Sequence, residues 1–432
     1  MANAASDLEL TPNYLVGVTA SCNVKQIYFS FPHLLTFGET SVDLWTIHVN
    51  SSSLTHVAAL SEWIDYPIER GIIIDESRGL VVIPQCDRPV GLWVNNLHDG
   101  HLIKKVALFG CISVARIQYD TGRVLVAVDD DDDTWLLVCD LTESDPTRPM
   151  FRTEITGSSL TSEGEERRFN GFGPVWLSRA GEVVAWAGES SGMSMSLMLW
   201  PPTDEPNDAL PPSRFTKIPR TISVGDQEDG AINMQCATAM GDDRFLMCTA
   251  EAVLDVLDGP ETYGCVIRVL AKPSLETFWA SSLIWEHLGV LRHVPSLNAV
   301  VAIGYISERK YGDSPDYALT VTVLDASTGE QRRHERVKFR EHGSPVRVCD
   351  ISMKAAGGKE VVDLVVIFCD GGVLVRPLEA FIREGFPRVF DSSQVKVARP
   401  FGDKVGKSTH AAVGDGHAVV VEDNQKVSLV VW

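Results

Sequence analysis

The chain has 432 residues, of which 44 % are hydrophobic and 22 % charged, and its formal net charge is −20. The hydrophobic share suffices for a packed core, and the length suits two or three average domains or one large all-β unit. So acidic a surface repels phosphate backbones and anionic lipid headgroups, which excludes nucleic acids and membranes as direct partners.

The first ten residues, MANAASDLEL, lack the basic and apolar regions of a secretory signal. No apolar run approaches the length of a membrane span. The nine cysteines include no C-x-x-C pair, and Cys139, Cys248, Cys265 and Cys369 lie in apolar runs. An odd number of scattered cysteines disfavours a disulfide framework and favours buried free thiols. We therefore expect a cytoplasmic or nuclear protein.

One pattern recurs along the chain: an apolar strand, an acidic or glycine-containing turn, and a second apolar strand that often ends at a tryptophan. The instances in chain order are residues 34–47, 80–94, 124–140, 183–200, 245–270, 300–325, 364–378 and 418–432. Their equivalent end positions are Trp45, Trp93, Cys139, Trp200, Leu270, Leu324, Leu378 and Trp432. A repeat of about 40–60 residues with four short strands per unit is typical of a β-propeller.

The steps LWT, LWV, VCD, LWP, VLD and VVW at these ends resemble the aliphatic-Trp-Asp step of WD40-like β-propellers. EHGSPVRVCDIS, residues 341–352, resembles the Gly-His segment that precedes an innermost strand in that superfamily. The resemblance covers almost the whole chain. It implies an all-β fold, with residues 1–432 forming one closed propeller of four-stranded blades. Eight repeats predict eight blades; if one unit is false, the count is seven, the commoner WD40 number.

The eighth repeat stops at its third strand, which would leave an unpaired sheet edge. NYLVGVTA, residues 13–20, has the character of a strand and precedes the first complete repeat. We therefore expect this N-terminal strand to close the last blade. The second repeat is expected to contain strands at GIIIDES, GLVVIPQ, VGLWVNN and HLIKKVAL, and the one fair helix candidate is LEAFIREGF, residues 378–386.

Departures from the repeat length predict loop insertions at residues 157–173, 201–212, 251–262 and 307–318. The first is polar and glycine-rich, and the second is proline-rich. Loops of this kind tolerate growth that blades do not, and they often carry function.

Two segments resemble catalytic motifs but lack the required context. GESSG, residues 188–192, matches G-x-S-x-G, yet a strand-like run rather than a helix follows Ser190. GDKVGKST, residues 402–409, has three residues between its glycines where a phosphate-binding loop needs four. A β-hairpin turn and a polar loop account for them better than catalysis, and we predict no enzyme activity and no cofactor.

The histidines and spare tryptophans also favour structural roles. His98 and His101 flank a turn, which is better explained by solvated imidazoles than by a metal site. The run Asp129–Asp133 lacks the alternating ligands and the glycine of a calcium loop, so no metal is predicted. Trp63, Trp279 and Trp285 could line a groove for a glycan or peptide, but blade packing is the better explanation.

The turns between second and third strands are acidic in nearly every repeat. In a propeller these turns share one face, so the pattern predicts an acidic face that attracts a cationic ligand. Turn chemistry alone also favours aspartate, but five in a row exceed what one turn needs. The residues predicted for this face are Asp87, Asp129, Asp130, Asp131, Asp132, Asp133, Glu189, Asp255, Asp258, Asp313, Asp370 and Asp423.

The sequence thus favours a non-enzymatic scaffold or adaptor that docks a basic segment of a protein partner on an acidic loop face. Three alternatives remain: a propeller that binds small ligands or glycans, a propeller hydrolase, and a substrate receptor of a ubiquitin-ligase-type complex. The last is implied by a similarity of style to the propellers of fungal F-box proteins, although no F-box-like helical segment precedes the repeats.

Overall fold

A computed structural model describes residues 13–20, 23–39, 41–48, 53–60, 72–85, 91–107, 113–120, 123–130, 133–141, 151–154, 159–160, 166–167, 176–177, 182–189, 192–199, 233–241, 243–253, 262–271, 276–284, 287–308, 316–337, 346–356, 358–369, 371–386 and 408–432. The chain divides into two compact units, residues 1–63 with 287–432 and residues 64–286. Each unit is described by itself. In the second unit many strands are described only as main chain.

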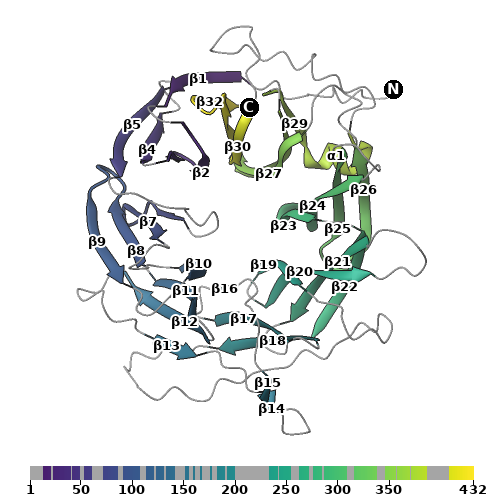
Figure 1. The fold of residues 1–432 in the computed structure, drawn as a ribbon. Helices are drawn as coiled ribbons and strands as arrows, with labels where there is room; N and C mark the ends of the chain where they lie inside the picture. Colours follow the sequence, from purple (N-terminus) through teal and green to yellow (C-terminus); the bar gives the residue numbers. More distant parts are fainter. Residues whose placement is uncertain are drawn as a thin grey trace, which may run out of the picture. The chain divides into compact units, whose positions relative to one another are not determined.

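The first unit contains four antiparallel sheets (Figure 1). In hydrogen-bonded order their strands are β2 (Gln26–Ser30), β3 (His33–Phe37), β4 (Val42–His48) and β5 (Ser53–Leu60); β23 (His287–Val294), β24 (Ala299–Glu308), β25 (Asp316–Asp325) and β26 (Gln331–Val337); β27 (Val346–Ala356), β28 (Lys359–Phe368) and β29 (Val373–Pro377); and β1 (Asn13–Thr19), β32 (Lys426–Val431), β31 (His417–Glu422) and β30 (Ser408–Gly414). A short 3-10 helix, Pro295–Leu297, joins β23 to β24.

The second unit contains four further sheets of three or four strands and one short hairpin. The strands are β6 (Ile73–Asp75), β7 (Leu80–Gln85), β8 (Gly91–Asn96) and β9 (Leu102–Ala107); β10 (Ser113–Asp120), β11 (Arg123–Asp130), β12 (Asp133–Asp140) and β13 (Phe151–Glu154); β16 (Trp176–Leu177), β17 (Glu182–Glu189) and β18 (Gly192–Leu199); β19 (Asn233–Ala239), β20 (Arg244–Val253), β21 (Thr262–Ala271) and β22 (Thr277–Ile284); and the hairpin β14 (Ser159–Leu160) and β15 (Glu166–Arg167).

The sheets follow the predicted repeats. The four strands expected in the second repeat are β6 to β9, and the segment that resembles a Gly-His step leads into β27, the first strand of its sheet. The described residues thus hold six four-stranded and two three-stranded sheets. The closed arrangement and the number of blades, eight or seven, stay predictions, as does the single domain over residues 1–432.

The N-terminal strand completes the last sheet, as predicted. Strand β1 is antiparallel to β32, with Asn13 opposite Val431 and Thr19 opposite Lys426. Beyond β1, the main-chain N–H of Ala20 donates to the carbonyl of Gln425 over 2.8 Å. The beginning of the chain is thereby held on the edge of β32 and on the turn before it.

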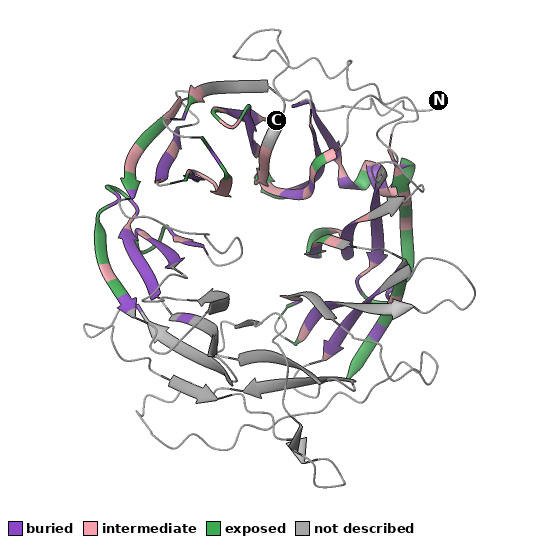
Figure 2. Cartoon of the chain, in the orientation of Figure 1, coloured by how far each residue is buried: buried purple, intermediate pink, exposed green. Residues whose placement is uncertain are grey.

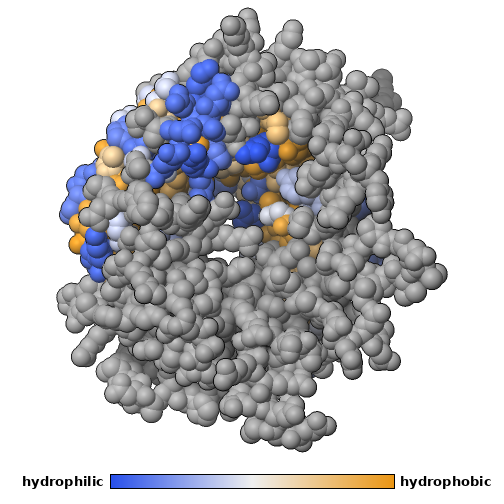
Figure 3. Space-filling view, viewed as in Figure 1, coloured by the Kyte–Doolittle hydropathy of each residue, from blue (hydrophilic) through white to orange (hydrophobic). Residues whose placement is uncertain are grey.

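Burial follows the order of strands within a sheet (Figure 2). All five residues of the second strand β3 are buried, whereas the fourth strand β26 has the pattern exposed, exposed, intermediate, exposed, intermediate, exposed, intermediate. A strand covered on both faces is mostly apolar, which is why the second and third strands appear in the sequence as predominantly apolar runs. Figure 3 shows broad hydrophilic areas among the described residues on the face in view, with smaller apolar areas between them.

Apolar side chains fill the spaces between neighbouring sheets of the first unit. One cluster joins Val365 and Ile367 of β28 to Val420 of β31 and Val430 of β32. Another joins the last sheet to β3 and β4 and includes Trp45. The indole N–H of Trp45 donates to the Thr36 hydroxyl over 3.0 Å, so this buried tryptophan keeps a polar partner.

The predicted insertions are shorter than expected because strands extend into them. Residues 251–253 belong to β20 and residue 262 to β21. Residues 307–308 belong to β24 and residues 316–318 to β25. The segment 157–173 contains the hairpin β14–β15, and residues 201–212 lie outside the described residues.

The cysteine prediction is confirmed at two positions and wrong at a third. Cys248 and Cys265 are buried free thiols within strands β20 and β21. Cys369 lies in the turn after β28 and is partly exposed, because the apolar run ends one residue earlier, at Phe368. The side chain of Cys139 lies outside the described part.

The predicted helix forms after β29, where the other sheets continue into a fourth strand. Helix α1 spans Leu378–Glu384 and buries Leu378 and Phe381, which join the core between the sheets of β23–β26 and β27–β29. It ends at Gly385, whose φ is +78°. Within the described ranges no helix is long and apolar enough to cross a membrane.

Replacing Gly385 with alanine should destabilise the protein more than the same change at Gly358. Both residues have φ of +78°, but a Cβ at Gly385 would overlap the Glu335 carboxylate, whereas a Cβ at Gly358 meets nothing within 4 Å. We expect a loss of about 1 kcal/mol for Gly358→Ala from backbone strain alone and at least about 2 kcal/mol for Gly385→Ala, measured by urea unfolding. Equal losses would contradict the clash.

Removing residues 1–20 should lower the thermal midpoint by about 5–10 °C, because β32 loses its hydrogen-bonded partner. Removing residues 1–10 alone leaves β1 intact and should have little effect. A synthetic peptide of residues 11–22, added to the longer truncation, should restore part of the loss. Scanning calorimetry of the three samples measures this, and equal midpoints for both truncations would count against the closing role of β1.

Candidate functional site

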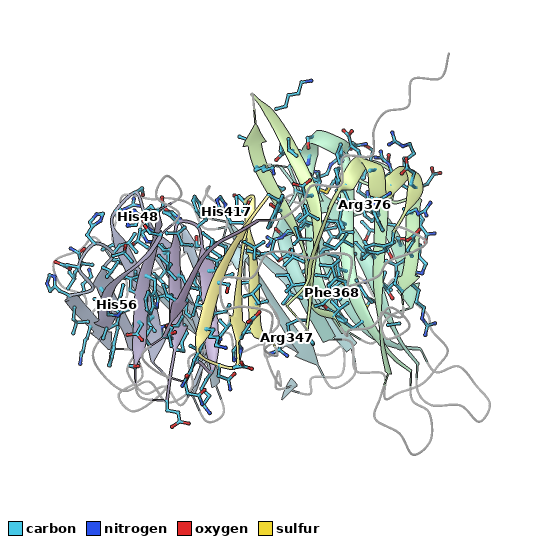
Figure 4. All side chains as sticks on the ribbon, turned by 90° about the horizontal axis from the view of Figure 1, so that it is seen from above. His48, His56, Arg347, Phe368, Arg376 and His417 are labelled. Carbon is cyan, nitrogen blue, oxygen red and sulfur yellow. The ribbon has the colours of Figure 1, made fainter. Side chains whose placement is uncertain are left out.

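The turns between second and third strands share one end of the sheets in the first unit. Figure 4 shows Arg376, at the end of the third strand β29, and His417, at the start of the second strand β31, toward one end. Phe368, at the end of the second strand β28, lies toward the other end. This arrangement is what a common acidic face requires of the loops in this unit.

Strand β11 ends and strand β12 begins within the run of aspartates, and the two strands form an antiparallel hairpin, as predicted. Asp130, the last residue of β11, is opposite Asp133, the first residue of β12, and Asp129 is opposite Thr134. Two residues therefore connect the strands. Side chains directly opposite in an antiparallel pair lie on the same face, and like charges there repel. The register pairs two acidic residues, Asp130 and Asp133, at directly opposite positions of the hairpin.

Two more of the predicted residues lie at hairpin tips. Glu189 ends β17 opposite Gly192, and Asp423 is exposed in the turn between β31 and β32 with φ of 51°. The neighbouring Glu422 is buried, with 3 % of its surface exposed. The remaining predicted residues lie outside the described ranges, namely Asp87, Asp131, Asp132, Asp255, Asp258, Asp313 and Asp370.

Lysines accompany the acidic turn residues whose side chains are described. Lys25 Nζ lies 3.1 Å from Glu39 Oε1, and Lys426 Nζ lies 3.6 Å from Asp423 Oδ2. Such exposed pairs are worth about 0–1 kcal/mol each and weaken in salt. Lys25 precedes the first strand of its sheet and lies outside the turn that it neutralises. Counting charges within turns therefore overestimates the negative charge at these two positions.

The strands around the two catalytic look-alikes favour the structural interpretation. Strands β17 and β18 on either side of Ser190 pair along their length, so G-x-S-x-G lies at a hairpin rather than at a strand-to-helix elbow. Ser408 and Thr409, the end of the P-loop look-alike, begin strand β30. A phosphate loop needs a helix N-terminus there.

The histidine turn and the described tryptophan also have structural roles. The N–H of His98 donates to Asn96 Oδ1 over 2.7 Å, and the N–H of His101 donates to Asp99 Oδ1 over 3.0 Å, so both close the turn after β8. Trp279 is 7 % exposed within β22; Trp63 and Trp285 lie outside the described part. No group of three or more potential metal ligands occurs among the residues described.

A polar cluster that the sequence did not indicate joins the sheets of β27–β29 and β30–β32. Asp363 of β28 is fully buried. Its Oδ2 accepts a hydrogen bond from the indole N–H of Trp432 over 3.1 Å and lies 3.6 Å from Lys354 Nζ. Lys354 also donates to the main-chain oxygen of Trp432 over 2.9 Å. Lys354 and Trp432 are 78 residues apart in the sequence, so no local motif marks the cluster.

A second charged network fastens α1 to the neighbouring sheet. Arg333 of β26 bonds to Glu335 and to the main-chain oxygen of Glu384, and Glu335 accepts the N–H of Phe386 over 2.8 Å. Hydrogen bonds from Arg383, together with the nearby Arg376, lower the pKa of Glu384. Arg333 and Glu335 each bond to a residue 51 positions further along the chain, so no local motif marks this network.

No family model matches the chain, and no curated protein matches it. Among solved structures, the Dos1 propeller is similar over 97 % of this chain and 95 % of that chain, with 10 % identity and a TM-score of 0.50. BamB from Moraxella catarrhalis covers 98 % of this chain and 100 % of its own, with 12 % identity and a TM-score of 0.49. At such identities the likeness concerns the fold alone, and the similarity to the Dos1 propeller supports a β-propeller fold.

Neutralising Asp133 should stabilise the β11–β12 hairpin at low ionic strength. Asp133→Asn removes one of two opposed carboxylates, and we expect a gain of about 0.5 kcal/mol in 20 mM NaCl that disappears in 0.5 M NaCl. Asp140→Asn is the matched control, because Asp140 is opposite Arg123 in the same hairpin. That variant should lose stability at low salt. Shifts of the same sign in both variants would contradict the register argument.

Proposed function

We propose that the protein is a non-enzymatic scaffold that docks a basic segment of a protein partner on the acidic ends of its hairpins. The observation that carries this proposal is the opposition of Asp130 and Asp133 at the tip of the β11–β12 hairpin. Like charges at directly opposite positions of an antiparallel pair are destabilising, and a cationic ligand that binds at this tip would offset their repulsion.

The charge of the whole protein supports the same partner class. A net charge of −20 raises the local concentration of cations and speeds their encounter with the surface. It also opposes direct contact with nucleic acid or an anionic membrane. Turn residues are exposed rather than buried, so charge should contribute to the association rate and to salt dependence more than to tight affinity.

The architecture supports a scaffold over an enzyme. Both catalytic look-alikes lie next to strands in a setting that lacks the elbow or the helix their chemistry needs. We take the eight sheets as the blades of one closed propeller with β1 completing the last blade. The hairpin tips of both units would then contribute to one docking face.

Replacing Asp129–Asp133 with asparagine should weaken binding of a lysine- and arginine-rich peptide about tenfold in 50 mM NaCl and flatten the salt dependence of its Kd. Asparagine suits turns as well as aspartate does, so the hairpin itself should persist. Fluorescence anisotropy with a labelled basic peptide, from 50 to 300 mM NaCl, measures both effects.

The matched control removes five exposed acidic residues from turns or adjoining strand ends at the opposite ends of their sheets, namely Glu76, Asp99, Glu330, Glu360 and Asp415. Their replacement with glutamine or asparagine changes the net charge equally. Wild-type binding by this control variant together with weakened binding by the Asp129–Asp133 variant supports a local site. Equal weakening would reduce the effect to net charge, and unchanged binding in both would contradict docking at this hairpin.

A further inference from the structure

The cluster of Asp363, Lys354 and Trp432, which we call the β32 lock, joins the end of β32 to strands β27 and β28 of the neighbouring sheet. Trp432 directly follows β32, and one edge of β32 is hydrogen-bonded to β1. The lock therefore fastens to the neighbouring sheet the same strand that holds the N-terminal strand. It also ends the apolar cluster between these two sheets, to which Trp432 contributes its ring.

The lock consists of polar groups, but one of its buried polar atoms has no hydrogen-bond partner among the described residues. Oδ2 of Asp363 has both partners, the indole N–H of Trp432 and the ammonium of Lys354. Oδ1 is also buried and has no hydrogen-bond partner among the described residues. Lys354 retains 22 % exposure, so water screens the one cation that faces this carboxylate. A buried carboxylate with one unpartnered oxygen favours its neutral form.

We propose that Asp363 makes the β32 lock proton-responsive, so that uptake of a proton by this side chain fastens β32 more firmly to the sheet of β27–β29. The neutral carboxyl group still accepts the indole hydrogen bond of Trp432. It no longer places an incompletely compensated charge among apolar side chains, and Lys354 keeps its bond to the main-chain oxygen of Trp432.

The direction in which stability changes with pH follows from the opposing effects on the pKa of the Asp363 carboxyl group. Burial raises the pKa of Asp363 above its ordinary value of 3.8, while Lys354 and the Trp432 hydrogen bond lower it less. A group whose pKa is raised by folding contributes stability that is fully present below the ordinary pKa. That contribution is lost as the pH rises through the raised value, so wild-type Asp363 costs stability at neutral pH.

Lys354 of the lock comes from β27. Among the described residues, the turn between β30 and β31 supplies Asp415, and the start of β31 supplies His417. Burial lowers the pKa of His417, and the Lys354 charge lowers it further, whereas the hydrogen bond and the charge of Asp415 raise it. The N–H of Gly416, in the same turn, donates to Ser352 opposite Asp363 over 2.8 Å, so this contact is uncharged.

The test compares the wild-type chain with Asp363→Asn, which keeps the shape and the acceptor for Trp432 but cannot ionise. Thermal midpoints are measured in half-unit steps from pH 4 to pH 8. We expect the variant to exceed the wild type by about 3 °C at pH 8 and by less than about 1 °C at pH 4. Glu360→Gln, an exposed acidic residue on the same β27–β28 hairpin, should show no such pH-dependent difference.

Hydrogen exchange reports on the lock itself. After correction for intrinsic rates, amides of residues 427–432 in the wild type should exchange about threefold to tenfold more slowly at pH 5 than at pH 8, and this change should vanish in Asp363→Asn. Trp432→Phe removes the indole N–H and should accelerate exchange in this segment at both pH values. An Asp363→Asn variant that is less stable than the wild type at pH 8, or a difference independent of pH, would overturn the proposal.

Discussion

The structure depends on the antiparallel pairing of β1 with β32. Every strand needs hydrogen-bond partners for its main chain, and the last sheet obtains its fourth strand from the other end of the sequence. Around this pairing the turn before β32 receives the N–H of Ala20, and the apolar cluster that includes Trp45 joins the sheet to β3 and β4. The β32 lock fastens the end of the same strand to the sheet of β27–β29. The acidic hairpin tips can be tolerated because the strands beneath them are held by apolar contacts that do not depend on charge.

The sheets could be predicted from sequence because strands that are buried on both faces are rich in apolar residues. A second or third strand is mostly apolar, as in β3 and β31, whose central residues are aliphatic. The closing strand was predictable by elimination, since an open edge at β32 required a partner. Fourth strands such as β26 are harder to recognise in the sequence, because one face meets water and their residues are mixed. The helix candidate at residues 378–386 is confirmed by α1, which buries Leu378 and Phe381, but its place after β29 instead of a fourth strand was not predicted.

The sites were less predictable than the sheets. The sequence gives the position of each charge along the chain, whereas the interaction energy of a charge depends on its neighbours in the folded structure. The hairpin of β11 and β12 was expected, but its register, which pairs Asp130 with Asp133, comes from the structure. The lysines that neutralise Glu39 and Asp423 come from a segment before the sheet and from a strand, respectively. Asp363 is harder still: it is one acidic residue within an apolar run, and its importance depends on Lys354 and Trp432, which arrive from other strands.

The sharing of one sheet by β1 and β32 has a consequence for synthesis on the ribosome. The two strands are separated by more than four hundred residues, which at about 5–20 residues per second corresponds to roughly 20–80 s of translation. During that time β1 has been made and its eventual partner has not. The last sheet can therefore be completed only after translation of the chain through β32, and β1 must be kept from pairing with other strands until then.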